Sequence, residues 1–163
     1  MGTLLLDLLS KDEDRDYELR FDIDLLAQRL TYAMQFVDNE AIAQTQIGLF
    51  SASTGVASAL RVAAAMPDNV AAVVSRGGRP DLAGSWALAQ VRAPTLLIVG
   101  GLDTAVIALN KSAQAGLANC ESELRIVPGA SHLCEEPGTL EDVARLSGDW
   151  FVRHLTSGAG AGG

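Results

Sequence analysis

Short, nearly continuous apolar runs recur along the chain and are separated by longer segments. Residues 70–75 and 95–100 are almost entirely apolar, which is typical of strands covered on both faces of a sheet. Residues 3–9, 45–51 and 123–127 are further apolar runs of strand length. The pattern therefore predicts five strands in these ranges.

The segments between the runs carry apolar residues at helical spacing. Residues 21–37 repeat them every three or four positions, and an Ala-rich stretch over 54–66 stops at Pro67. Further helices are predicted near 84–91, over 104–118 and over 139–155. Strands that alternate with helices indicate an α/β fold, here a three-layer sandwich with a mostly parallel sheet.

The length sets the domain count. A chain of 163 residues is long enough for one domain and too short for two ordinary ones, and no internal repeat or linker divides it. We therefore expect a single domain over residues 1–156. Residues 157–163 are rich in Gly and Ala, and we expect a flexible tail there.

The excess of acidic over basic residues limits the kinds of partner that the protein is expected to bind. Twelve Lys and Arg against twenty Asp and Glu give a net charge of −8, which argues against nucleic acid and anionic membranes as partners. No run approaches the roughly 20 apolar residues of a membrane span, and the apolar run at 4–9 lacks the basic start of a secretory signal. We expect a cytoplasmic protein.

The two cysteines, Cys120 and Cys134, lie on either side of the predicted strand at 123–127. Extended residues rise about 3.3 Å each, so the two thiols are expected to lie beyond disulfide distance. No metal-ligand spacing accompanies them. Two free thiols and no metal or other cofactor are predicted.

Candidate chemistry begins where the predicted strand at 45–51 runs into a helix. The sequence Ser51-Ala52-Ser53-Thr54-Gly55 matches the nucleophile elbow G-x-S-x-G with Ser in the first position. Such a turn lifts the Ser53 hydroxyl above the sheet, aims the Thr54 amide at a developing oxyanion, and favours small residues at 51 and 55. The alternative is an ordinary strand-to-helix turn in which Ser53 or Thr54 caps the helix.

An acid and a histidine follow two other predicted strands. Asp103 comes after the run at 95–100, where a helix cap is the alternative role. His132 comes just past the strand at 123–127, whereas His154 lies near the end of the last predicted helix, where a surface role is expected. Because the carboxyl ends of parallel strands meet at one edge of a sheet, Ser53, Asp103 and His132 are candidates for one site.

The order Ser, Asp, His, each after a different parallel strand, is that of the α/β-hydrolases. With the segments GLFSASTG, PTLLIVGGLD and VPGASHLCEEPG, the chain resembles the dienelactone hydrolase-like branch of that superfamily from residue 3 to residue 155. The resemblance implies a carboxylic-ester hydrolase in which Ser53 attacks, His132 is general base and then acid, and Asp103 holds the imidazole. The Thr54 amide is then the predicted oxyanion donor, and the substrate a small ester.

A Gly-Gly loop carries two guanidinium groups, Arg76 and Arg79, after the strand at 70–75. They are candidates to bind a carboxylate or phosphate of the substrate, which suits the acidic substrates of dienelactone hydrolases. The alternative is that one of them pairs with Asp81 or Glu135 and the other is solvated.

The chain departs from the family pattern at its beginning: compared with the family's eight-stranded fold, it is expected to start at the fourth strand. The resemblance therefore implies a truncated α/β-hydrolase fold, without the early loop that donates a second oxyanion amide and without the strand between 3–9 and 45–51. Apolar strand edges left open in this way favour self-association, so a homo-oligomer is predicted.

Three functions remain open on the sequence alone: a working esterase, a fragment or degenerate hydrolase that binds ligands with little turnover, and a structural or interaction module that kept the fold. The presence of all three candidate residues favours the hydrolase.

Overall fold

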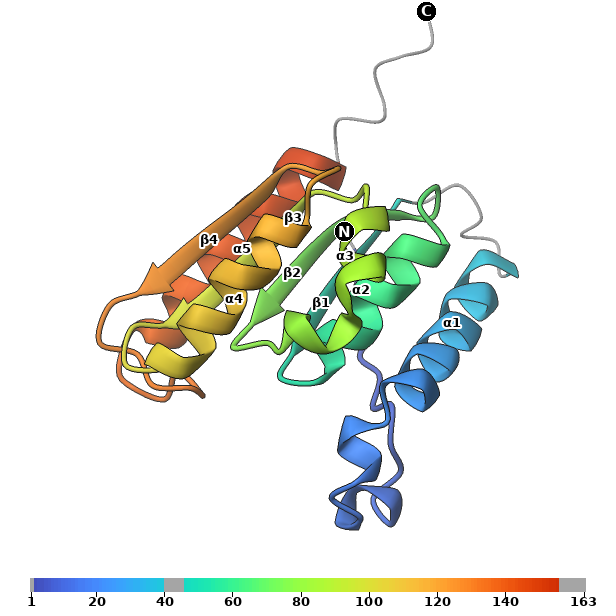
Figure 1. The fold of residues 1–163 in the computed structure, drawn as a ribbon, viewed down its shortest axis with the longest axis horizontal. Helices are drawn as coiled ribbons and strands as arrows, with labels where there is room; N and C mark the ends of the chain where they lie inside the picture. Colours follow the sequence, from blue (N-terminus) through green and yellow to red (C-terminus); the bar gives the residue numbers. More distant parts are fainter. Residues whose placement is uncertain (1, 40–45, 156–163) are drawn as a thin grey trace, which may run out of the picture.

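The sheet has four strands, all parallel, in the part of the chain that the computed structural model describes, residues 2–39 and 46–155. Their order across the sheet is their order along the chain (Figure 1). The strands are β1 (Ile47–Ala52), β2 (Val70–Arg76), β3 (Thr95–Gly100) and β4 (Ser122–Val127). With this order, the loops that follow neighbouring strands lie beside each other at one edge of the sheet.

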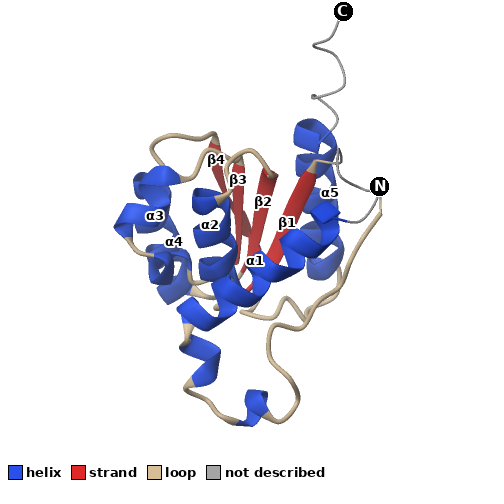
Figure 2. Cartoon of the chain, turned by 90° about the vertical axis from the view of Figure 1, so that its right-hand side faces the viewer, coloured by secondary structure: helices blue, strands red, loops and turns tan. Residues whose placement is uncertain are grey.

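Helices cover both faces of the sheet (Figure 2). The helices α2 (Gly55–Ala65), α3 (Ser85–Gln90) and α4 (Thr104–Gly116) lie on one face, and α5 (Thr139–Leu155) lies on the other. The helix α1 (Ile23–Asn39) packs on α2. The predicted three-layer α/β fold is confirmed.

Two apolar clusters fill the spaces between these layers. Val73 and Leu97 face α2, whereas Val74 and Ile98 face α5 and pack with Trp150. Neighbouring residues of a strand point to opposite faces, so a strand buried on both sides must be apolar throughout. This arrangement explains the continuous apolar runs of β2 and β3.

The close approach of α5 also accounts for a glycine in β1. A Cβ atom at Gly48 would lie 2.6 Å from Cε1 of Phe151, a separation that side chains do not tolerate. Gly48 therefore allows the aromatic ring of α5 to rest directly on the strand backbone.

The predicted strand at 3–9 is wrong. These residues form no strand, and Leu4, Leu5 and Leu6 are exposed. An apolar run becomes a strand only where a neighbouring strand accepts its backbone hydrogen bonds. Here β1 pairs with β2 on one side and with no described strand on the other.

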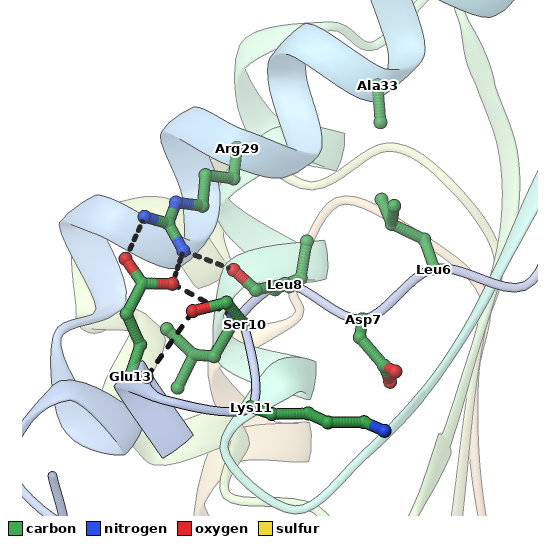
Figure 3. Close-up of a pocket in the computed structure, with 9 residues that line it drawn as sticks. Leu6, Asp7, Leu8, Ser10, Lys11, Glu13, Arg29 and Ala33 are labelled. Carbon is green, nitrogen blue, oxygen red and sulfur yellow. Dashed lines mark hydrogen bonds and ion pairs between the residues drawn. The ribbon is translucent and has the colours of Figure 1, made fainter. Parts of the chain in front are cut away.

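The segment after Leu6 is instead held against α1 by an arginine (Figure 3). The guanidinium of Arg29 donates from Nη1 to the Leu8 carbonyl at 2.7 Å and from Nη2 to Glu13 Oε1 at 2.6 Å. The polar stretch that follows contains two single-turn 3-10 helices, Glu13–Arg15 and Leu19–Phe21.

The remaining element predictions agree with the structure to within a few residues. The start of the strand predicted at 45–51 and the tail predicted over 157–163 fall partly or wholly outside the described residues. Both cysteines are free thiols, as expected. Among the described residues, no helix has the length and apolar character needed to cross a membrane.

Candidate active site

Ser53 occupies the turn between β1 and α2 in a strained backbone conformation. Its φ angle is 50°, in the left-handed region that residues other than Gly rarely adopt. Its amide donates to the Arg76 carbonyl at 3.4 Å, and its own carbonyl accepts from the Arg79 amide at 3.0 Å. These contacts hold the turn in place, and the Ser53 side chain is exposed at the carboxyl edge of the sheet.

The residues that flank Ser53 have the geometry of an elbow. Thr54 precedes the first turn of α2, and no acceptor for its amide is found among the described residues. The N-terminus of a helix offers such amides to an anion. The expected need for a small residue at position 55 is weaker than the motif implies, because a Cβ at Gly55 would lie 4.0 Å from that of Ser51.

Asp103 and His132 are joined by a short hydrogen bond. Oδ2 of Asp103 lies 2.6 Å from Nδ1 of His132, within the range of charge-assisted bonds. The Asp103 side chain is 16% exposed and that of His132 is 45% exposed. A largely buried carboxylate on Nδ1 leaves Nε2 of the ring to act on other groups.

The loop after β2 contacts both the Ser53 turn and His132. Gly77 has a φ of 53°, and a Cβ there would lie 3.0 Å from the His132 carbonyl oxygen and 3.5 Å from the ring atoms Cε1 and Nδ1. The Gly77 amide donates to the Ile98 carbonyl at 2.8 Å. A glycine at this position lets the imidazole approach the loop backbone closely.

The structure thus places Ser53, Asp103 and His132 in loops at one edge of the sheet and joins the last two. The hydrogen bond of the imidazole in the described part of the chain goes to Asp103, and none joins it to Ser53 Oγ. Unliganded sites commonly have loose catalytic hydrogen bonds that tighten when substrate binds.

The two arginines of the Gly-Gly loop differ in their contacts. Arg79 donates from Nε and Nη2 to the two carboxylate oxygens of Asp81, at 2.9 and 2.8 Å, and this pairing raises the pKa of Arg79. Arg76 donates from Nη1 to the Leu133 carbonyl at 2.9 Å. Pairing with Asp81 was the alternative that the sequence left open for one of the two.

A groove of about 620 Å³ lies beside Arg76 on the α5 side of the sheet. Apolar side chains supply much of its wall, among them Phe50, Leu133 and Leu140. A second cavity, of about 560 Å³, is lined by residues 6–11 together with Glu13, Arg29 and Ala33 (Figure 3). Arg76 lines the groove, and Ser53, Asp103 and His132 line neither cavity.

Two residues that sequence reasoning missed support the loops of the site. Glu136 accepts the Ser131 amide on Oε2 at 2.9 Å, directly before His132. Asn110 is fully buried in α4 and donates from Nδ2 to the Gly78 carbonyl at 3.0 Å. An amide at a core-facing position of a helix is a signal that could have identified Asn110. The contact of Glu136 with Ser131, in contrast, can be recognised only in the folded loop.

The environment of the thiols does not favour them as nucleophiles. Burial raises the pKa of Cys134 and also that of Cys120, which disfavours the reactive thiolate. Among the described residues, no group of three or more His, Cys, Asp or Glu side chains is arranged to hold a metal ion.

Comparisons of the sequence identify long relatives of which this chain matches a part. Two proteins of Mycobacterium tuberculosis, from strains CDC 1551 and H37Rv, are 53% identical to it over 155 residues. Both are provisionally named phosphoribosyl transferases. The match covers 94% of this chain and 34% of each relative, so the chain spans about a third of their length. No family model matches the sequence.

Solved structures relate the chain to hydrolases. Dienelactone hydrolase from Anabaena variabilis is 50% identical, with a TM-score of 0.86, over 91% of this chain and 70% of that one. Monoacylglycerol lipase from Paleococcus ferrophilus shares the fold at 15% identity and a TM-score of 0.68, over 81% of this chain and 76% of the lipase. At 50% identity and with most of the hydrolase covered, the similarity goes beyond a shared fold. The chain belongs to the dienelactone hydrolase family of the α/β-hydrolase fold.

Proposed function

We propose that this chain is a serine hydrolase that cleaves small carboxylic esters through an acyl-enzyme. The observation that carries the proposal is the 2.6 Å contact between Asp103 and His132 at the same sheet edge as Ser53, whose φ is 50°. Membership of a hydrolase family supports it. A left-handed serine between a strand and a helix is the backbone arrangement of a nucleophile elbow.

In the first half of the reaction, Ser53 Oγ attacks the ester carbonyl carbon while His132 Nε2 takes the hydroxyl proton. The carbonyl π electrons move to the oxygen, and the resulting tetrahedral intermediate collapses as the C–O bond to the alcohol breaks. His132 returns the proton to the leaving alkoxide, so an alcohol departs and the acyl group stays on Ser53.

In the second half, His132 takes a proton from water, the hydroxide attacks the acyl carbon, and the bond to Ser53 Oγ breaks. The proton then returns to Ser53, and the carboxylic acid leaves. Asp103 serves both halves, because its hydrogen bond to Nδ1 fixes the tautomer and stabilises the imidazolium ion that forms twice.

The Thr54 amide is the proposed donor to the oxyanion. It lies one residue after Ser53 at the start of α2, where the helix macrodipole also favours negative charge. Removal of one such donor typically costs an enzyme about 10²–10³ in kcat. Only proline removes a backbone N–H, and it would also fix φ in this turn, so the role of the Thr54 amide is inferred from position.

Arg76 and Arg79 are proposed to favour esters that carry an anionic group. Arg76 is the stronger candidate, because Leu133 uses one of its N–H groups and the residue lines the groove. Arg79 is engaged by Asp81 through two of its donors. We expect Arg76→Ala to raise KM for anionic esters more than for neutral ones, and Arg79→Ala to have the smaller effect. Equal KM ratios in both variants and in the unaltered protein would exclude an anion-binding role.

The name of the mycobacterial relatives is not carried over to this chain. Those proteins are about three times as long as the part that this chain matches. This chain also aligns with a dienelactone hydrolase structure, over 91% of its length. The matched third therefore corresponds to hydrolase sequence.

A fluorophosphonate probe tests the proposed nucleophile directly. We expect rapid formation of an adduct on Ser53, located by mass spectrometry, and no adduct in a folded Ser53→Ala variant. Hydrolysis of p-nitrophenyl acetate should be lost in the same variant. Folded protein that neither reacts with the probe nor turns over the ester would favour the alternative function, a ligand-binding module that kept the hydrolase fold.

A further inference from the structure

His132 sits in the middle of a tight turn that spans Ser131 to Cys134. The Cys134 amide donates to the Ser131 carbonyl at 3.2 Å and closes the turn. Cys134 is buried and has a φ of 56°, a conformation that costs energy in a residue other than Gly. Such a turn keeps its shape only if its surroundings hold it there.

Two charged side chains hold the backbone on either side of His132. Glu136 Oε2 accepts the amide of Ser131 at 2.9 Å, and Arg76 Nη1 donates to the carbonyl of Leu133 at 2.9 Å. The residue before the histidine and the residue after it are thus each held by an ionic side chain. Arg76 comes from the end of β2, whereas Glu136 comes from the same loop as His132.

Glu136 is itself anchored to the start of α5. Its carbonyl accepts the Thr139 amide at 3.1 Å and the Thr139 hydroxyl at 2.7 Å. Thr139 is buried at the first position of the helix. The carboxylate of Glu136 therefore connects the turn that carries His132 to a rigid, packed element.

The contact between Glu136 and Ser131 involves an ionised carboxylate. Hydrogen bonds from the backbone and side chain of Ser131 lower the pKa of Glu136 below its usual value of 4.5, so the group is charged at neutral pH. A hydrogen bond to a charged acceptor is roughly twice as strong as one between neutral groups.

We propose that Glu136 is a positioning residue for His132: its carboxylate fixes the Ser131 amide and thereby holds the imidazole against Asp103. The expected effect of Glu136 on kcat rests on the proposed function. The role of Glu136 in holding His132 depends only on the contact between His132 and Asp103. Glu136 does not touch the reacting atoms.

Three substitutions at this position separate its roles. Glu136→Ala removes the acceptor, and we expect kcat to fall by about 10²-fold, because small displacements of a catalytic group have effects of this size. KM should stay within about twofold, since the ground-state contacts to substrate are intact. Glu136→Gln keeps an oxygen for the Ser131 amide and should recover most of the rate, whereas Glu136→Asp is too short to reach the amide and should not.

A matched control is available in the first turn of α5. Glu141 is exposed, has the same side chain as Glu136, and is described without a side-chain hydrogen bond or ion pair. Glu141→Ala should leave kcat and KM unchanged. Circular dichroism gives the folded fraction of each variant without depending on the reactivity of Ser53, so loss of folded protein is not mistaken for loss of rate.

A proton NMR experiment provides a readout that does not need turnover. The Nδ1 proton in the 2.6 Å contact between His132 and Asp103 should give a low-field resonance outside the amide region. We expect this resonance in the unaltered protein, in Glu136→Gln and in Glu141→Ala, and its loss or broadening in Glu136→Ala. If Glu136→Ala keeps both the resonance and kcat, the proposal is overturned. If the protein hydrolyses no ester, the proposed function fails, and the resonance in the same variants still decides whether Glu136 positions His132.

Discussion

Gly100, the last residue of β3, lies directly against the carbonyl of Ser131, so closely that a Cβ at position 100 would collide with this oxygen and with the carbonyl of Ala130. Both contacts are with backbone atoms, which cannot turn aside as a flexible side chain could. The loop that carries His132 therefore rests on the end of β3.

This contact predicts a loss of stability in Gly100→Ala. Overpacking of this kind typically costs about 1–3 kcal/mol, and the loop must also move away from Asp103. Urea unfolding should show a lower midpoint for the variant. Gly148→Ala is the control, because nothing lies within 4 Å of a Cβ there and Ala is favoured over Gly in a helix by about 0.5–1 kcal/mol. A urea midpoint for Gly100→Ala equal to that of the unaltered protein would mean that the loop carrying His132 can shift at little cost in free energy.

The left-handed conformation of Ser53 predicts a trade-off between stability and reactivity. Gly tolerates a φ of 50° without the Cβ clash that any other residue incurs. Ser53→Gly should therefore be more stable than Ser53→Ala by about 1 kcal/mol, while neither reacts with the fluorophosphonate probe. Thermal unfolding of the two variants side by side makes the comparison. Equal stability would indicate that the turn relaxes once the hydroxyl is removed.

The short contact between Asp103 and His132 predicts a severe effect of Asp103→Asn. An amide in place of the carboxylate favours the wrong imidazole tautomer, and in serine hydrolases this lowers kcat by about 10⁴ with the geometry intact. Steady-state kinetics with a p-nitrophenyl ester would measure the loss, and circular dichroism would check the fold. A loss of only a few-fold would show that Asp103 does not serve the site, since its side chain makes no capping hydrogen bond to α4 either.

The ion pair between Glu13 and Arg29 predicts a pH-dependent contribution to stability. The hydrogen bond from Arg29 lowers the pKa of Glu13 from 4.5 to about 2. Between these values the unfolded chain binds the proton more readily, so the stabilisation is complete above pH 4.5 and is lost as the pH falls toward 2. Glu13→Gln should flatten the dependence of the urea midpoint on pH within that window. Glu18→Gln, in the same polar segment, should retain the slope of the unaltered protein.

The edge position of β1 bears on the prediction of a homo-oligomer. Among the described strands β1 has a neighbour on one side only, and Phe50 on this strand is 51% exposed. If copies associate through this edge, light scattering at micromolar concentration should give a mass above that of a monomer. Phe50→Lys should then shift the mass toward the monomer, because a charged edge disfavours pairing between strands. A monomeric mass for the unaltered chain would contradict the prediction.

The sequence was most informative about the buried strands and about the polar residues that directly follow them. β2 and β3 are apolar over most of their length because both of their faces are buried, and this pattern predicted their bounds closely. Once the strands are parallel, residues that follow them must meet at one edge. Ser53 and Asp103 could therefore be assigned to one site before any distance was known.

Other features depend on contacts that no local pattern encodes. The run at 3–9 has the composition of a strand, but a strand exists only if another strand lies beside it, and none of those described does. Likewise, the carboxylate of Glu136 reaches Ser131 only because the intervening turn doubles back at Cys134. The left-handed conformation of Cys134, which makes this reversal possible, is not apparent from a cysteine in a sequence.

The order of the described elements has a consequence for how the protein is made. A ribosome completes all four described strands and the helices of one face before it reaches the residues of α5. Until Trp150 and Val143 have emerged, the apolar side chains of Ala72, Val74, Leu96 and Ile98 lack the cover that α5 provides on their face. The nascent chain thus exposes this apolar surface until α5 folds back onto the sheet. A stop codon shortly before residue 139 would leave Ser53, Asp103 and His132 all translated on a product prone to aggregate.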